Sequence, residues 1–241
     1  MKILNEILAG LDYDAPVREI RMGPFQTGVF TRYCALASTP HQAGPHHESF
    51  PVKEAGSLLE KSARELAFMA ESENVFEAAV GMAAINSLLE VDESRFENLN
   101  AADILAREGE GKRIAIIGHF PFIGRLRRIA SQVWVIEKNP RDDDFTEDDG
   151  ARLIPQADVV GITGTAFTNH TIENILAACA PRAYVMVLGD TTPLMPLLFE
   201  YGIDCISGTR VVDPAAALRC ASQGATFRQL KGIRLLAMEK S

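Results

Sequence analysis

Five short apolar runs in this chain are each followed by glycine or by polar residues. In the first, Arg113–Gly124 (RIAIIGHFPFIG), the run stops at Gly118 and opens into a turn that contains His119 and Pro121. A short buried run followed by a glycine turn is typical of a central parallel strand, which presents backbone N–H groups to a ligand. The sequence therefore predicts a small-molecule or ion site where these strands end.

The residues that follow the five runs are small or able to form hydrogen bonds. Glycine lets a ligand approach the main chain, threonine and asparagine supply short polar groups, and the helix N-termini that follow can hold an anion. Ligands of open α/β sheets gather outside the carboxyl ends of the strands. For His119, a ligand-facing role and a role as a core histidine both stay open. The residues that we predict to bind a ligand on these grounds are Gly118, His119, Pro121, Glu137, Asn139, Thr163, Gly164, Thr165, Asn169, Gly189, Thr191, Thr192 and Gly208.

Known cofactor motifs are absent from these turns. Glu137 lies about 20 residues after Gly118, where a ribose-binding acid belongs, but GHFPFIG is not G-x-G-x-x-G. Pro121 and Phe122 occupy positions where a pyrophosphate needs open backbone. There is also no G-x-x-x-x-G-K-[ST] loop and no G-x-S-x-G elbow. These absences argue against NAD-type redox chemistry and acyl hydrolysis, and favour a nucleoside-like ligand such as S-adenosylmethionine over a dinucleotide.

Metal ligation is an open alternative at one loop. His41, His46 and His47 lie close together in Thr39–Pro51, and Glu48 adds a carboxylate, but the spacing fits no familiar closed site. A solvated loop is the default interpretation. The acidic run Asp142–Asp149 lacks the glycine and final glutamate of an EF-hand loop, so we expect a solvated connection there.

Cysteine usage gives no metal site. The four cysteines form no C-x-x-C pair, and we expect reduced thiols without a catalytic role. No catalytic residue, metal ligand or cofactor is assigned from the residue pattern, and a transition metal or metal chelate is the cofactor class left open.

Composition restricts the partners. The chain has 241 residues and a net charge of -8, which argues against nucleic acid as a partner because phosphate binding needs clustered Lys and Arg. No signal peptide and no membrane-length apolar stretch is present, so we expect a cytoplasmic protein without a membrane partner. The composition allows a monomer or a homodimer.

The first part of the chain, residues 1–110, combines strands with helices. We expect a helix near Lys2–Leu11, strands at Val17–Met22 and Gln26–Ala37, and then the loop described above. Helices follow from a capping box at Ser57-x-x-Glu60, from Asn74-x-x-Glu77 and over Ala101–Glu108. Strands followed by helices predict an α+β unit, which ends at the Gly109–Lys112 turn.

Strands and helices alternate through residues 111–241. We expect strands at Ile114–Ile117, Val133–Ile136, Val159–Thr163, Tyr184–Leu188, Cys205–Ser207 and Ile233–Met238, with helices at Gly124–Ala130, around Ile172–Cys179, around Leu194–Tyr201 and at Pro214–Gln223. Repeated β-α units with short apolar strands predict a doubly wound, mostly parallel α/β sheet.

Several motifs together resemble a known family. GHFP, EKNP, ITGTAFTNHTI, VLGDTTPLMPLLFEYGID and ISGTRVVD, with GMAAINSLL upstream, resemble the "putative heavy-metal chelation" family from about Gly23 to the C-terminus. The resemblance implies an enolase-N-terminal-like domain, here residues 1–110, joined to a Rossmann-like domain, here residues 111–241. It also implies a site in the interdomain cleft, to which Asn86 contributes from the first domain.

Three functional hypotheses follow. The first is heavy-metal chelation or metal-cofactor handling, with a small polar or anionic ligand or a metal chelate in the interdomain cleft. The second is a transferase-type enzyme that uses a nucleoside-like cofactor such as S-adenosylmethionine. The third is a non-catalytic partner protein that retains the fold.

Overall fold

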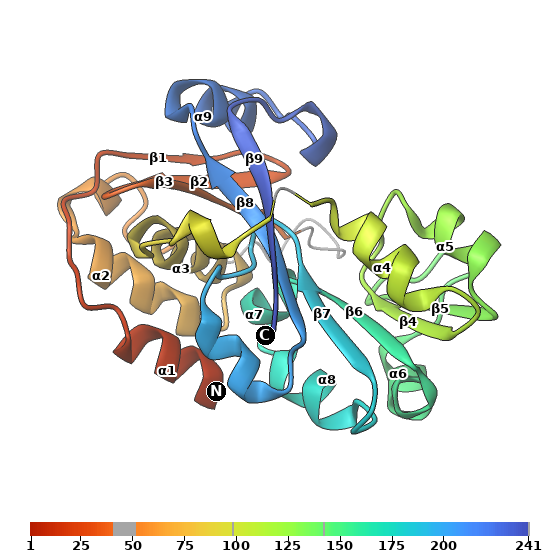
Figure 1. The fold of residues 1–241 in the computed structure, drawn as a ribbon. Helices are drawn as coiled ribbons and strands as arrows, with labels where there is room; N and C mark the ends of the chain where they lie inside the picture. The colour runs from red at the N-terminus through yellow and green to blue at the C-terminus, as the bar shows by residue number, and fades with distance from the viewer. Residues whose placement is uncertain (41–51, 98, 142, 241) are drawn as a thin grey trace.

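Two β-sheets organise the chain in the computed structural model, which describes residues 1–40, 52–97, 99–141 and 143–240 (Figure 1). One is a three-stranded antiparallel sheet of order β1-β2-β3. The other has six strands in the order β5-β4-β6-β7-β8-β9, of which β9 alone runs antiparallel to its neighbour. The mixed α/β architecture confirms the predicted fold class.

The antiparallel sheet comes from the first part of the chain. Its elements are α1 (Lys2–Ala9), β1 (Glu19–Met22), β2 (Gln26–Phe30), β3 (Cys34–Ser38), α2 (Ala63–Ala67) and α3 (Val75–Leu88), with 3-10 helices at Leu58–Glu60, Phe68–Glu71 and Glu93–Arg95. The predicted single segment Gln26–Ala37 is wrong, because the chain reverses at Thr31–Tyr33 and makes two paired strands. The predicted capping box at Ser57 is also wrong. Ser62 and Glu65 form the box and start α2.

Helix α3 is buried on nearly every side, since alanine, glycine and large apolar residues surround its axis. It packs against β2, β3 and the segment before it, and Asn74 caps its N-terminus by accepting from the Phe76 N–H. A methyl group at Gly81 would lie 2.0 Å from the Ala70 nitrogen, so the absent side chain is what allows this close approach. The small residues of α3 thus let the neighbouring backbone approach the helix axis closely.

The larger sheet comes from the second part of the chain. Its strands are β4 (Arg113–Ile117), β5 (Gln132–Ile136), β6 (Val159–Thr163), β7 (Tyr184–Leu188), β8 (Cys205–Val211) and β9 (Ile233–Glu239), and its helices are α4 (Ala101–Gly109), α5 (Ile123–Ile129), α6 (Glu147–Leu153), α7 (Thr165–Thr168), α8 (Ile172–Ala178) and α9 (Pro214–Ser222), with 3-10 helices at Ile154–Gln156, Pro196–Tyr201 and Phe227–Gln229. The predicted strands β6 and β7 are confirmed to the residue. The segment near Leu194–Tyr201 is a 3-10 helix that starts at Pro196, not a longer helix, and β8 continues to Val211 because it pairs along its length with β9.

The acidic run contains a helix that the sequence interpretation missed. Thr146 and Asp149 form a capping box at the start of α6, and Glu147 and Asp148 lie in the first turn, where carboxylates favour the helix dipole. The expectation of a solvated connection is therefore wrong from Thr146 onward.

Apolar layers cover both faces of the parallel sheet. Ile114 and Ile116 of β4 pack with Ile104 and Leu105 of α4, whereas Ala115 faces the other layer. Because side chains alternate across a strand, one short apolar run supplies both layers. The second layer continues into the buried side chains of α1 and α3, so one core cluster runs from the first part of the chain into the second.

The two parts are also joined at the antiparallel sheet. Helix α9, from the second part, lies against β1 and β2 (Figure 1). Its Leu218 packs against Gly28 of β2 and contributes to a small cluster with Cys34 and Leu36. Among the described residues, no helix combines the length and the apolar character needed to cross a membrane. The division into domains at residue 110 stays a prediction.

Candidate functional site

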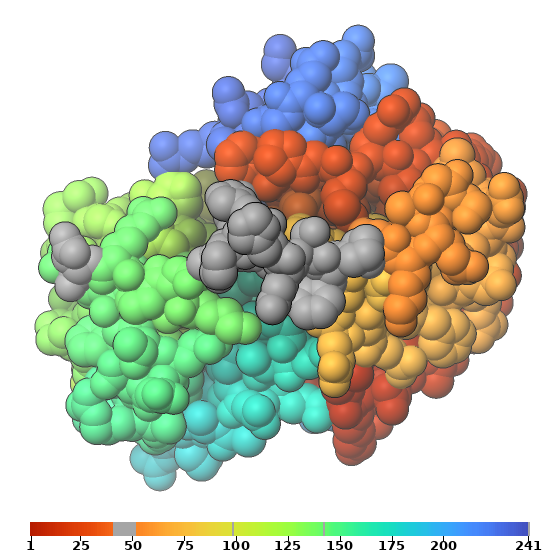
Figure 2. Space-filling view, turned by 180° about the vertical axis from the view of Figure 1, so that it is seen from behind, coloured from red at the N-terminus to blue at the C-terminus, as the bar shows by residue number. Residues whose placement is uncertain are grey.

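A cavity of about 1370 Å³ lies at the carboxyl ends of the parallel strands β4 to β8. The start of β2 and the end of β3 form its opposite wall through Phe25, Gln26, Ser38 and Thr39. In Figure 2, residues after β4 (green) lie on the left of the view and residues of the first part of the chain (orange) lie on the right. Elements from both parts of the chain therefore surround one hollow.

Most residues predicted from strand ends lie around this cavity. The strand order changes direction between β4 and β6, and ligands of doubly wound sheets gather at such a switch point. That these residues bind a ligand stays a prediction. Those that line the cavity are Gly118, His119, Pro121, Glu137, Asn139, Thr163, Gly164, Thr165, Asn169, Gly189, Thr191 and Gly208.

Asn86 and Thr192 are not among the lining residues. The Asn86 side chain donates from Nδ2 to the carbonyl oxygens of Asp190 and Thr191, at 3.3 Å each. Thr192 is buried, and its backbone nitrogen would lie 2.7 Å from a methyl group placed on Gly164. Asn86 therefore holds the loop after β7, to which Thr192 belongs, in position beside the cavity.

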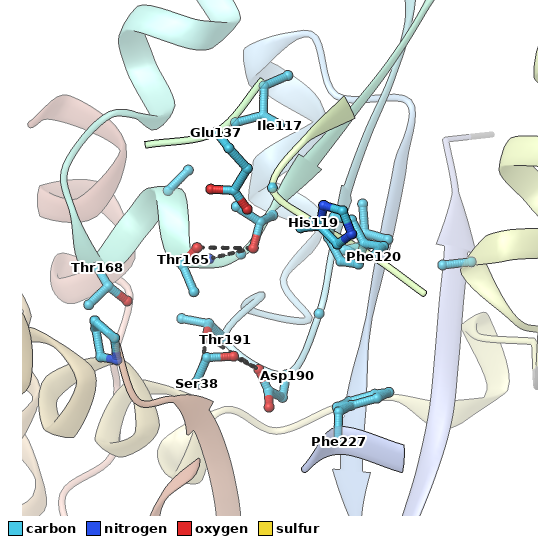
Figure 3. Close-up of a pocket in the computed structure, with 18 of the residues that line it drawn as sticks. Ser38, Ile117, His119, Phe120, Glu137, Thr165, Thr168, Asp190, Thr191 and Phe227 are labelled. Carbon is cyan, nitrogen blue, oxygen red and sulfur yellow. Dashed lines mark hydrogen bonds between the residues drawn. The ribbon is translucent and has the colours of Figure 1, made fainter. Parts of the chain in front are cut away.

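The β4 turn depends on its glycine. Gly118 has a φ of +104°, which residues with a side chain rarely adopt, and a methyl group there would lie 2.9 Å from Cβ of Thr163. The Thr163 and Thr165 hydroxyls lie 3.0 Å apart, and the Thr165 N–H donates to Oγ1 of Thr163 (Figure 3). This arrangement presents both hydroxyls next to the turn that carries His119.

Residues of the antiparallel sheet complete the site, and the sequence interpretation missed them. The Ser38 hydroxyl donates to Oδ1 of Asp190 at 2.6 Å, and the Ser38 N–H donates to Oγ1 of Thr191 at 2.9 Å (Figure 3). The partners are separated by 152 and 153 positions in the chain. No local pattern at Ser38 signals such a distant contact.

Asp190 is a deeply buried carboxyl group of the cavity wall, with 4% of the residue exposed. Burial raises its pKa, and the hydrogen bond from Ser38 opposes that shift. The Gln26 side chain hydrogen-bonds to Asp190 and, like Ser38, lowers its pKa. Within the described part of the chain, Thr168 Oγ1 has no hydrogen-bond partner, although buried polar atoms are normally paired.

Four polar side chains gather where β4 and β5 end. Nδ1 of His119 lies 3.5 Å from Oδ2 of Asp144, and Nε2 of His119 lies 3.2 Å from Nη1 of Arg141. Glu137 accepts from the Lys138 N–H at 3.1 Å. Burial raises the pKa of Glu137, while the neighbouring His119 lowers it and Asp144 raises it further. This edge of the cavity can hold or release protons.

Aromatic rings form another part of the wall. Phe120 and Phe122 stack with ring centroids 5.1 Å apart, and Phe25 and Phe227 also line the cavity. Figure 3 shows Phe120 and Phe227 among the side chains of the site. Apolar rings beside a small set of polar groups are typical of small-molecule sites.

His170 connects the two parts of the chain. It has a φ of +59°, and its Nε2 donates to the carbonyl oxygen of Ala70 at 2.8 Å. The contact ties the loop after α7, which includes the cavity residues Asn169 and Thr171, to the first part of the chain.

Metal ligands are not evident in the described ranges. Across them, no group of three or more His, Cys, Asp or Glu side chains is placed to hold a metal ion. The predicted alternative site at His41, His46, His47 and Glu48 lies outside the described residues. The four cysteines are free thiols, and burial raises the pKa of Cys34 and of Cys205 to about 12.

Two family models match this chain, and both carry the description "Putative heavy-metal chelation". One matches residues 4–89 and the other residues 100–239. The sequence is also 28% identical over 167 residues to an uncharacterised protein of Methanocaldococcus jannaschii, a match that covers 66% of this chain. The chain spans 64% of that relative's length.

Solved structures share the fold. A protein of unknown function from the DUF364 family of Desulfitobacterium hafniense has a TM-score of 0.82 at 23% identity, covering 99% of this chain and 97% of that one. A second DUF364 protein of unknown function, from Pyrococcus horikoshii, has a TM-score of 0.79 at 21% identity, covering 99% and 98% of the two chains. These structures support the two-sheet architecture over nearly the full length.

Proposed function

This chain belongs to the family described as "Putative heavy-metal chelation", and we propose that its cavity binds a small polar or anionic molecule, either a metal chelate or the precursor of one. In this proposal the cavity is the cleft between the two predicted domains, residues 1–110 and 111–241. The observation that carries it is the wall itself, where threonine hydroxyls, glycine backbone and phenyl rings from both parts of the chain surround one volume.

The wall favours a chelate over a bare ion. A bare transition metal needs several His, Cys or carboxylate ligands at close range, and the described residues provide no such group. A volume of about 1370 Å³ is also much larger than one ion requires, and it exceeds the range of about 300 to 1,000 Å³ that is typical of small-molecule sites. Polar hydroxyls and aromatic rings suit the organic part of a chelate.

The transferase alternative receives no support from the comparisons. Neither family description and neither solved relative refers to a transferase or to S-adenosylmethionine. The chelation proposal is therefore the one that we carry forward.

Equilibrium dialysis of untagged protein against zinc chloride and against zinc citrate tests the proposal, with zinc measured in the protein fraction. We expect retention of zinc from the citrate complex and loss of that retention in Thr165→Val, which removes a hydroxyl from the cavity wall. Ser57→Ala, an exposed hydroxyl outside the cavity, is the matched control and should retain zinc as the unaltered protein does. Retention of zinc chloride in preference to the citrate complex, or of neither, would reject the proposal.

A further inference from the structure

Acidic and basic side chains both line the cavity, and the carboxylates among them are Glu137, Asp144, Glu147 and Asp190. Lys138, Arg141 and Arg228 all line it, and none of them forms an ion pair with a carboxylate in the part of the chain that the structure describes. In contrast, Arg113, Arg125 and Arg152 on outer surfaces each have a carboxylate partner. Unpaired cations that face a cavity favour a negatively charged ligand.

Arg141 directly contacts a titratable group of the cavity. Its Nη1 is 3.2 Å from Nε2 of His119. A guanidinium group has donors and no acceptor, so this contact requires a lone pair on Nε2 and places the imidazole proton on Nδ1. His119 is therefore neutral while Arg141 occupies this position.

Asp144 fixes the other side of the ring. Its side chain is 3% exposed, its Oδ2 is 3.5 Å from Nδ1 of His119, and the same oxygen accepts from the Arg141 N–H at 3.1 Å. A buried carboxylate beside Nδ1 stabilises an imidazolium if Nε2 also takes up a proton. The His119 side chain keeps 34% of its surface exposed, so a ligand can reach Nε2.

We propose that the β4–β5 edge of the cavity binds an anionic oxygen group, a carboxylate or a phosphate-like group, between Arg141 and His119, and that binding is coupled to protonation of His119. When an anion binds to the Arg141 guanidinium, that group no longer donates to Nε2 of His119. The Nε2 lone pair then faces the negative charge of the anion. Proton uptake at Nε2 converts that repulsion into a second charge-assisted hydrogen bond. The proton comes from solvent, and the resulting imidazolium lies between the ligand and Asp144.

The coupling predicts how the affinity for the anion changes with pH. A group that is protonated only in the complex makes binding stronger as pH falls and weaker as pH rises. Asp144, Glu137 and Arg141 are the charged groups that face His119. Glu137 acts in the same direction, because its own protonation at lower pH removes a negative charge beside the anion, and it must be tested separately.

This inference rests on the proposed function, because the same cavity holds the ligand. It adds the position at which the anionic group of that ligand binds. Isothermal titration with oxalate and with sulfate tests it without a metal. Both anions stay fully ionised between pH 6 and pH 8, so any proton taken up belongs to the protein. Titrations in two buffers of different ionisation enthalpy count the protons bound.

For the unaltered protein we expect uptake of about one proton per anion at pH 8, and therefore an affinity that rises about tenfold per pH unit, to about a hundredfold higher at pH 6. His119→Gln keeps a hydrogen-bonding side chain that cannot titrate, so it should bind without proton uptake. Glu137→Gln should retain the proton uptake, and Arg152→Gln, an exposed residue on α6, should behave as the unaltered protein does.

Binding of oxalate alone identifies a carboxylate site, and binding of both anions identifies a general oxyanion site, each consistent with the proposal. Binding that is independent of pH, or proton uptake that persists in His119→Gln, would overturn it and leave the chelation proposal intact. Absence of binding by both anions would overturn it as well, whereas retention of zinc citrate decides the proposed function independently.

Discussion

The Ser38 hydroxyl donates to Oδ1 of Asp190 across 2.6 Å and so joins the end of β3 to the loop after β7. The same serine donates its N–H to Thr191, and Asn86 donates to the carbonyl oxygens of the same two loop residues. These polar contacts from the first part of the chain thus fix one loop of the cavity. The shape of the cavity depends on this junction.

Replacement of Ser38 by alanine should lower the free energy of unfolding by about 1 to 3 kcal/mol, because it removes a partner from a buried carboxyl group. Urea denaturation followed by circular dichroism measures the change. Ser57→Ala, whose hydroxyl is exposed, should change stability by less than about 0.5 kcal/mol. Equal effects of the two substitutions would show that the Ser38–Asp190 contact contributes little.

Replacement of Asp190 by asparagine should change the pH dependence of stability. Burial raises the pKa of Asp190 above the ordinary value of 3.8, so the folded state binds this proton more tightly than the unfolded state. The contribution of this proton to the free energy of unfolding is fully present below pH 3.8 and is lost as pH rises through the raised pKa of Asp190. An asparagine side chain at this position cannot ionise and avoids this loss.

Urea denaturation between pH 4 and pH 8 measures this effect. The stability of Asp190→Asn relative to the unaltered protein should increase as pH rises. A difference that stays constant over this range would show that Asp190 titrates alike in the folded and unfolded chains.

Local sequence patterns predicted the second part of the chain well. Each β-strand there is a short apolar run, and residues next to a strand end must lie at the sheet edge wherever that strand is placed. Gly118, Thr163 and Gly189 could therefore be assigned to one cavity edge before their neighbours in space were known. Their positions follow from the chain direction alone.

Contacts between distant segments could not be predicted in this way. Ser38, Gln26 and Phe25 follow no strand that ends in a glycine turn, and they reach the cavity because the antiparallel sheet packs between α3 and α9. Arg141 and Asp144 lie in an acidic stretch whose composition suggests only solvent exposure. Their relation to His119 depends on the pairing of Phe145 with Ile136, which is a tertiary contact.

Cys34 and Cys205 should resist alkylation in the folded protein. Burial raises the pKa of both thiols to about 12, so little thiolate forms at pH 8, and both side chains are buried. Iodoacetamide treatment followed by peptide mass spectrometry should find both residues unmodified in native protein and modified in urea. Rapid modification in the native protein would show that the core around them opens readily.

Replacement of Gly118 by alanine should destabilise the protein and distort the cavity edge. The residue has a φ of +104°, and the new methyl group would lie 2.9 Å from Cβ of Thr163, closer than two carbon atoms tolerate. Backbone strain of this kind costs about 1 to 3 kcal/mol, and relief by rotation would move His119 away from Asp144.

Gly124→Ala provides the matched control for this substitution. Gly124 lies in helix α5 with no atom within 4 Å of a new methyl group, so alanine there should stabilise the protein by about 0.5 to 1 kcal/mol. Urea denaturation of both variants measures the opposite signs, and the dialysis against zinc citrate reports on the cavity. If Gly118→Ala were as stable as Gly124→Ala and bound the citrate complex normally, the conformation of the β4 turn would not be a requirement of the site.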